Sequence, residues 1–215
     1  MSFRFQNRIH AGRLLADNLG DYAGRPEVVV LGLPRGGVPV AHQVALRLRA
    51  PLDIFLVRKL GAPGQEELAM GAIASGGMVF LNDTVVEELG ASRQTINAVI
   101  ARELAELQRR ETAYRAQPRL DLRGRQVILV DDGLATGASM RVAFMAVRRQ
   151  HPAGIVAAAP VAERHTYDNF QREVGEIECV QIADDFRSVG QWYEDFSQTS
   201  EEEVRRLLAG EAGRQ

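Results

Sequence analysis

Apolar residues along the chain fall into short continuous runs that alternate with segments of helical spacing. Continuous runs are typical of strands buried on both faces of a parallel sheet. Segments 40–49 and 140–149 have the spacing of helices, and Pro152 and Gly154 end the second of them. This alternation predicts an α/β fold with an open, mainly parallel sheet of about five strands flanked by helices. The predicted strands are residues 28–33, 54–57, 127–130, 155–159 and 179–182.

Two segments depart from this alternation. Residues 61–77 hold five glycines and one proline, which predicts a long mobile connection that leads into a short hairpin. Residues 92–115 predict one long helix with an apolar stripe on one face, which indicates packing in the core or in a dimer interface. The stripe consists of Ile96, Val99, Ile100, Leu104, Leu107 and Tyr114.

The composition is that of one soluble globular domain, residues 1–215. The chain is 46% apolar and 25% charged, which are ordinary values. Cys179 is the single cysteine, so an internal disulfide is excluded and a reducing, cytoplasmic location is expected. The first ten residues lack the apolar stretch of a signal peptide, and no apolar run approaches the length of a membrane span. A formal net charge of −2 gives no reason to expect nucleic acid or an anionic membrane as a partner.

Residues 127–140 carry the pattern that is richest in chemistry. A buried strand delivers Asp131 and Asp132 to its carboxyl end, the place where open α/β sheets bind ligands. The small residues that follow open a helix, where backbone N–H groups and two hydroxyls can surround a phosphate. Two carboxylates beside a phosphate would repel it unless they accept hydrogen bonds, and vicinal ribose hydroxyls can donate them. Solvated acids and an ordinary helix cap would explain the acid pair but not the whole pattern, which predicts a site for a phosphorylated sugar.

This segment closely resembles the signature of the type I phosphoribosyltransferases, and its form DDGLATGAS is most similar to the adenine-specific branch. The resemblance implies an enzyme that uses 5-phosphoribosyl 1-diphosphate (PRPP) and Mg²⁺ to transfer phosphoribose to a nitrogenous base, with release of pyrophosphate, in nucleotide salvage. It also implies a core of about residues 25–183, a hood of about residues 184–200 and a homodimer. Asp131 and Asp132 are then catalytic acids on the ribose hydroxyls, and meet Mg²⁺ indirectly through them. The 5′-phosphate is expected on Ala135, Thr136, Gly137, Ala138 and Ser139.

The loop after the first strand resembles the pyrophosphate loop of the same family. It contains Arg35, Gly36 and Gly37. Consecutive glycines let the backbone approach an anion closely, and an arginine adds charge-assisted hydrogen bonds. The family likeness further implies a strained or cis peptide near residues 34–36.

A basic pair, Arg58 and Lys59, ends the second predicted strand. The family places basic residues there, against the diphosphate, and follows them with a loop that closes over the reacting centre; residues 60–77 are the expected lid. The alternative is a basic pair that caps a strand in solvent. Lys59 is the single lysine among 26 basic residues, which favours a specific use of its compact charge.

The stretch after the last strand resembles the hypoxanthine–guanine branch, where an aromatic residue stacks on the base and a later acid helps to hold Mg²⁺. By that match, which needs a one-residue insertion, Phe186 stacks on the base and Glu194 or Asp195 is the acid. Trp192 and Tyr193 are candidate base-binding residues, and hydrophobic cover for the sheet is an equal alternative for both.

Two departures from the family leave the base unidentified. Ala135 stands where the hypoxanthine–guanine branch has an acid before Thr-Gly. Residues 160–164 contain no lysine to bind a 6-oxo group, although Arg164 offers a substitute. The adenine branch, in turn, lacks the C-terminal segment.

A non-catalytic protein that binds PRPP and regulates a partner is the main alternative to an enzyme. A nicotinamide-dependent Rossmann enzyme is disfavoured, because no G-x-G-x-x-G follows the first strand, and no P-loop motif is present. The histidines have no metal-ligand or catalytic-triad spacing; they are His10, His42, His151 and His165.

Overall fold

Five parallel strands form the main sheet of the computed structural model, which describes residues 3–115 and 118–210. They lie in the order β2-β1-β6-β7-β8, so the predicted α/β fold is confirmed. One predicted strand is displaced: residues 52–54, and not 54–57, pair with β1, because Phe55 and Leu56 carry the chain on into a second sheet. The strands of the main sheet are β1 (Val28–Gly32), β2 (Leu52–Ile54), β6 (Gln126–Val130), β7 (Gly154–Glu163) and β8 (Ile177–Ala183).

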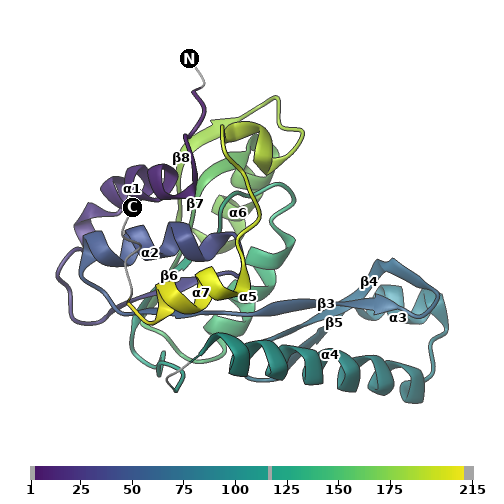
Figure 1. Cartoon of the computed structure of the whole chain (residues 1–215). Helices are drawn as coiled ribbons and strands as arrows, with labels where there is room; N and C mark the ends of the chain where they lie inside the picture. Colours follow the sequence, from purple (N-terminus) through teal and green to yellow (C-terminus); the bar gives the residue numbers. More distant parts are fainter. Residues whose placement is uncertain (1–2, 116–117, 211–215) are drawn as a thin grey trace.

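Helices cover both faces of this sheet, which explains why its strands are continuous apolar runs (Figure 1). Alternate residues of β1 enter different cores: Val28 and Val30 pack with the first two helices of the chain, whereas Val29 and Leu31 pack on the opposite face. The covering helices are α1 (Arg8–Asn18) and α2 (Gly37–Leu48) on one face, and α5 (Ala138–Arg148) and α6 (Arg164–Val174) on the other.

The strand order reverses between β1 and β6, and the carboxyl ends of these two strands lie side by side. Gly32 pairs with Val130, and the N–H of Leu33 donates to the carbonyl of Val130 at 2.8 Å. The loops after the two strands therefore leave the sheet together. In open α/β sheets this switch point is where ligands bind.

A second, antiparallel sheet extends from the main body as an arm (Figure 1). The prediction of a mobile connection at residues 61–77 is wrong, because most of these residues belong to the paired strands β3 and β4. Its glycines allow tight turns and close strand packing: Gly64 has a φ of 78°, and a Cβ at Gly71 would lie 3.0 Å from Cα of Leu81. The arm consists of β3 (Val57–Ala62), β4 (Gln65–Ala74), β5 (Met78–Leu81), α3 (Asp83–Leu89) and α4 (Arg93–Tyr114).

The long helix α4 was predicted correctly, and its apolar stripe packs within the chain. Ile96, Val99 and Leu107 lie in one core with Leu60 of β3. The C-terminal helix α7 (Glu201–Leu208) joins the same core. The stripe is thus explained without a second subunit, and the homodimer stays a prediction. Within the described residues no helix combines the length and apolarity that a membrane crossing requires.

Candidate active site

The acid loop, residues 131–137, leaves β6 at the switch point and is held by the neighbouring strand. β7 is twice as long as β6 and continues past its end. The N–H of Leu134 donates to the carbonyl of Val161 at 2.8 Å, and the carbonyl of Leu134 accepts from the N–H of Glu163 at 2.9 Å. These bonds extend the sheet by one bridge and fix the middle of the loop.

Helix α6 packs against the second half of the acid loop and supports it. The Thr166 hydroxyl donates to the carbonyl of Ala135 at 2.5 Å. Gly137 has a φ of 66°, and a Cβ there would lie 2.9 Å from the ring of Phe170. Glycine is therefore required at this position both by backbone conformation and by space.

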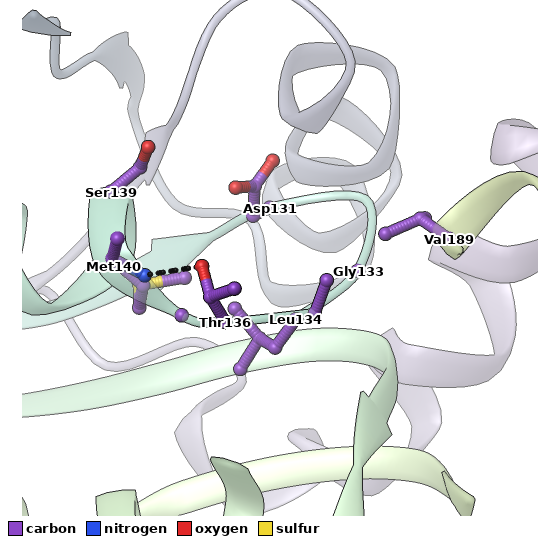
Figure 2. Close-up of a pocket in the computed structure, with 10 residues that line it drawn as sticks. Asp131, Gly133, Leu134, Thr136, Ser139, Met140 and Val189 are labelled. Carbon is purple, nitrogen blue, oxygen red and sulfur yellow. Dashed lines mark hydrogen bonds between the residues drawn. The ribbon is translucent and has the colours of Figure 1, made fainter. Parts of the chain in front are cut away.

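A pocket of about 160 Å³ opens above the acid loop, at the first turn of α5 (Figure 2). The hydroxyls of Thr136 and Ser139 are exposed there, and Val189 approaches from the C-terminal segment. The first N–H groups of a helix have no partner within the helix, and the helix dipole favours an anion at this end. The lining residues are Asp131, Gly133, Leu134, Ala135, Thr136, Gly137, Ala138, Ser139, Met140 and Val189.

The loop that holds Arg35, Gly36 and Gly37 lies directly against the acid loop. A cis peptide joins Pro34 to Arg35, at the place that the family likeness implied. A Cβ at Gly36 would lie 2.7 Å from Cγ of Asp132, and a Cβ at Gly37 would lie 2.7 Å from the Val130 carbonyl oxygen. Two glycines are thus needed for the loops to approach each other.

The two carboxylates of the acid loop have unequal surroundings. Burial and the neighbouring charge of Asp132 raise the pKa of Asp131 well above its ordinary value. Burial also raises the pKa of Asp132, while the charge of Arg8 opposes that rise. The Asp132 N–H donates to Oδ1 of Asp131 at 2.9 Å. The pair is therefore costly to keep ionised, and donors from a bound ligand would offset that cost.

Arg8, which no sequence pattern indicates, forms the shortest side-chain contacts of Asp132. Its Nε and one terminal nitrogen each lie 2.8 Å from Oδ2 of Asp132, and both side chains are largely buried. The two residues are 124 positions apart, so no local pattern links them. Thr166 and Phe170 were missed for the same reason.

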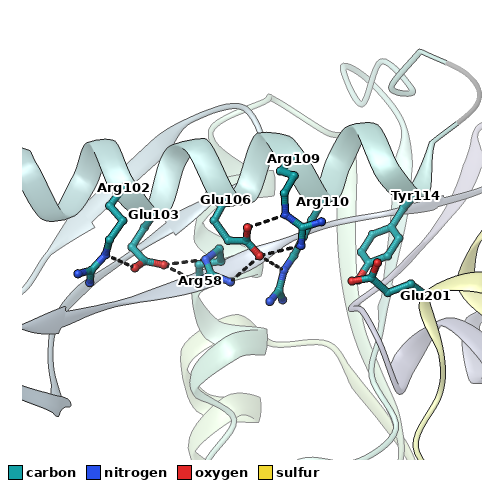
Figure 3. Close-up of polar contacts among 8 residues, drawn as sticks. All are labelled: Arg58, Arg102, Glu103, Glu106, Arg109, Arg110, Tyr114 and Glu201. Atoms are coloured by element: carbon teal, nitrogen blue, oxygen red, sulfur yellow. Dashed lines mark hydrogen bonds and ion pairs between the residues drawn. The ribbon is translucent and has the colours of Figure 1, made fainter.

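The basic pair lies at the base of the arm, where β3 begins, and not at the end of a strand. Arg58 donates to Oε2 of Glu103 through Nε at 2.8 Å, and lies 4.0 Å from Glu106 on the same helix (Figure 3). Burial raises the pKa of Glu103, but hydrogen bonds from Arg58 and Arg102 outweigh it and lower that pKa overall. The ion pair thus stabilises the fold at neutral pH. This stabilisation is lost as the pH falls through the lowered pKa of Glu103.

The aromatic residues of the hood have different exposures. Phe186 and Trp192 are half-buried and stacked, with ring centroids 6.2 Å apart. Tyr193 is buried, contacts Phe5 and donates its hydroxyl to the Asp132 carbonyl at 2.6 Å. Phe186 and Trp192 therefore offer partly open rings to a ligand, whereas packing and one hydrogen bond account for Tyr193.

The two acids predicted for Mg²⁺ lie at the surface of the same segment. Glu194 and Asp195 are exposed, and Oδ1 of Asp195 accepts from the Ser197 N–H at 2.9 Å. Among residues 3–115 and 118–210, no cluster of three or more His, Cys, Asp or Glu could hold a metal ion. Burial raises the pKa of Cys179 to about 12, which disfavours a thiolate nucleophile there.

Removal of the Thr166 hydroxyl tests whether α6 supports the acid loop. Thr166→Val leaves the Ala135 carbonyl without this donor and is expected to lower the free energy of unfolding by about 1–2 kcal/mol. It should also weaken phosphate binding, because the loop loses an anchor. Urea unfolding and phosphate titration would measure the two effects. Thr112→Val is the control, because it removes an exposed hydroxyl on α4 that also donates to a backbone carbonyl. Equal losses in both variants would contradict the anchoring role.

Comparisons with known proteins identify relatives of this chain. Two Mycobacterium tuberculosis proteins, MT0597 and Rv0571c, provisionally named phosphoribosyl transferases, are 44% identical over 205 residues, which cover 95% of this chain and 46% of theirs. The chain therefore spans about half the length of these curated relatives. The crystal structure of TT1426 from Thermus thermophilus is 41% identical, with a TM-score of 0.84, and the match covers 98% of this chain and 100% of that one.

A more distant structure shares the fold. The purine phosphoribosyltransferase of Pyrococcus horikoshii is 18% identical, with a TM-score of 0.50 over 86% of this chain and 90% of that one. The phosphoribosyl transferase domain family matches residues 5–196, and the resemblance to type I enzymes is confirmed. The chain belongs to the phosphoribosyl transferase domain family.

Proposed function

We propose that this chain is a phosphoribosyltransferase that transfers phosphoribose from PRPP to a nitrogenous base and releases pyrophosphate. The observation that carries the proposal is the arrangement at the switch point. A pocket at the start of α5 is lined by Asp131, and the loop of Arg35 contacts the neighbouring Asp132 at Gly36. A sugar that bears a phosphate at one end and a diphosphate at the other has the charges that this arrangement complements.

Each part of PRPP has a proposed partner. The 5′-phosphate binds in the pocket, on the backbone N–H groups and hydroxyls of residues 136–139. The ribose hydroxyls donate to Asp131 and Asp132, which lowers the cost of holding two adjacent carboxylates ionised. The diphosphate lies along the loop of Arg35 and Gly36. The distance between the ends of the substrate is then set by two rigid strand ends.

Catalysis in this scheme depends on position and charge. The bond from C1′ to the diphosphate oxygen breaks as a ring nitrogen of the base forms its bond to C1′, and positive charge develops on the ribose. Arg35 stabilises the negative charge that accumulates on the leaving diphosphate. The carboxylates hold the ribose so that C1′ faces the incoming base.

Mg²⁺ fits this site as an ion carried mainly by the substrate. Mg²⁺ binds through one or two carboxylates together with phosphates and water. The described residues provide two adjacent carboxylates and not a closed cage of acids. When bound, the ion would neutralise diphosphate charge, and Asp131 and Asp132 would meet it through the ribose hydroxyls.

The hood is the proposed place for the base. Phe186 and Trp192 have half-buried rings, and Val189 of the same segment contacts Gly133 in the acid loop. An aromatic face suits a planar heterocycle of any kind. The proposal therefore covers nitrogenous bases as a class.

Arg58 and Lys59 are expected to have separate tasks, because neighbouring strand residues point to opposite faces. Arg58 faces α4, as Leu60 does, whereas Val57 on the other face packs with the core of α5. Arg58→Ala should lower stability at pH 7, and the loss should become smaller as the pH falls through the lowered pKa of Glu103. Lys59→Ala should lower kcat/KM on the order of 10-fold. Unfolding curves and kinetics of this matched pair would measure both; kinetics unchanged in Lys59→Ala would remove it from the scheme.

A mass-spectrometric screen for nucleotide products tests the proposed function. The protein is incubated with PRPP, Mg²⁺ and a panel of purine, pyrimidine and nicotinic bases, and its thermal stabilisation by PRPP is measured in parallel. A new nucleoside monophosphate would establish the activity and name the base. Stabilisation without product would favour the regulatory, PRPP-binding alternative. If PRPP neither stabilises the protein nor gives a product, the pocket at α5 binds a different ligand.

A further inference from the structure

Arg8 is the residue at which four segments of the chain meet. It begins α1 and is 12% exposed. Two of its nitrogens contact Oδ2 of Asp132, and the third donates to the Ser197 carbonyl at 2.7 Å. Its guanidinium lies 3.9 Å from the centre of the Phe196 ring. A Cβ on Gly36, in the pyrophosphate-loop segment, would come within 3.2 Å of Nε.

The contact with Asp132 restricts the orientation of that carboxylate. Nε and a terminal nitrogen both lie 2.8 Å from the same oxygen, Oδ2. Two donors of a planar guanidinium on one oxygen hold Oδ2 in place. Oδ1 is then the oxygen of Asp132 that these two Arg8 nitrogens do not hold.

The N-terminal segment and the hood hold Arg8 in place. The Phe5 N–H donates to the Trp192 carbonyl at 2.8 Å, and the Phe5 carbonyl accepts from the Glu194 N–H at 2.8 Å. The Asn7 side chain accepts from the His10 N–H at 2.9 Å and caps the helix that begins at Arg8. Arg8 therefore has a fixed backbone on one side and a fixed carbonyl partner on the other.

We propose, on the basis of the function proposed above, that Arg8 is a positioning residue for the ribose site. By holding Oδ2 of Asp132, it presents Oδ1 to a ribose hydroxyl of PRPP. Through the Ser197 carbonyl and the Phe196 ring it also joins the hood to the acid loop. Arg8 acts through Asp132 and does not touch the reacting atoms.

Steady-state kinetics and PRPP calorimetry of Arg8 variants test this role. Both are measured at a temperature below the Tm of each variant. Arg8→Ala is expected to raise KM for PRPP on the order of 10-fold, with a smaller change in KM for the base. Arg8→Lys, which keeps the charge without the fork, should recover part of the loss. Arg13→Ala on the exposed side of the same helix is the matched control and should behave as the wild type.

A double variant separates positioning from general support of the fold. If Arg8 acts through Asp132, Arg8→Ala should add little to the loss already caused by Asp132→Asn. Fully additive losses, or an unchanged KM for PRPP in Arg8→Ala, would overturn the inference while the proposed function stands. Wild-type protein that does not bind PRPP would overturn both.

Discussion

Asp131→Asn is expected to lower kcat on the order of 1,000-fold and, in the absence of ligand, to raise the Tm by a few degrees. The carboxylate holds a ribose hydroxyl in the proposed scheme, and an amide cannot replace its charge in the transition state. Burial and the charge of Asp132 raise the pKa of Asp131 in the folded protein. Ionisation therefore destabilises the fold above the ordinary carboxyl pKa, and a neutral amide removes that penalty.

Asp132→Asn is the control, because it should raise the Tm less than Asp131→Asn does: burial raises the pKa of Asp132 too, but the charge of Arg8 opposes that rise. Asp132 neutralises the largely buried Arg8, and a neutral side chain would leave the guanidinium without its ionic partner. Both variants should lose activity, but Asp131→Asn should gain more stability than Asp132→Asn. Thermal unfolding without ligand and kinetics with PRPP would measure the two properties. Equal changes of Tm in the two variants would contradict the assignment of the larger ionisation penalty to Asp131.

The gain in stability expected for Asp131→Asn follows from the position of the pair at a strand end. β6 is buried on both faces, so the residues directly after it enter a site with little water. Functional sites commonly retain groups that destabilise the fold. A gain in stability together with a loss of turnover would be the result expected for residues kept for a ligand.

Local patterns in the sequence were sufficient to predict the parts of the site that lie within one strand and its following loop. The acid pair and the small residues before α5 are contiguous, so the buried run before them already specifies the end of the sheet where they lie. The same holds for the loop at Arg35, which follows β1. The order of the strands, and hence the contact between the two loops, was not predicted, because it depends on how distant segments pair.

Contacts between distant segments could not be predicted. Arg8 is one of 25 arginines in the chain, and nothing near it in the sequence marks it as the partner of Asp132. The direction of Arg58 depends on where α4 packs, which is a property of the whole arm. The arm itself was mistaken for a mobile loop because glycine weakens the strand pattern, whereas Gly71 here allows two strands to approach closely.

Gly36→Ala is expected to lower kcat/KM by 100-fold or more, on the order of the loss that a displacement of about 1 Å causes at a reacting centre. Gly36 has a φ of −62° and a ψ of −33°, a conformation that alanine adopts freely. Any effect must therefore come from the added methyl group. Its carbon would lie 2.7 Å from Cγ of Asp132, so one of the two loops has to move.

The contacts of Arg8 determine which of the two loops moves to make room for the methyl group. Arg8 holds Oδ2 of Asp132 at 2.8 Å, so the carboxylate cannot rotate away without the loss of an ion pair between largely buried groups. The loop of Arg35 is then displaced from the acid loop, and the diphosphate and ribose sites no longer fit one PRPP molecule. PRPP calorimetry and kinetics would measure the loss. Gly20→Ala adds the same methyl group where nothing lies within 4 Å, and should behave as the wild type. If Gly36→Ala bound PRPP with wild-type affinity, the two loops would not form one site.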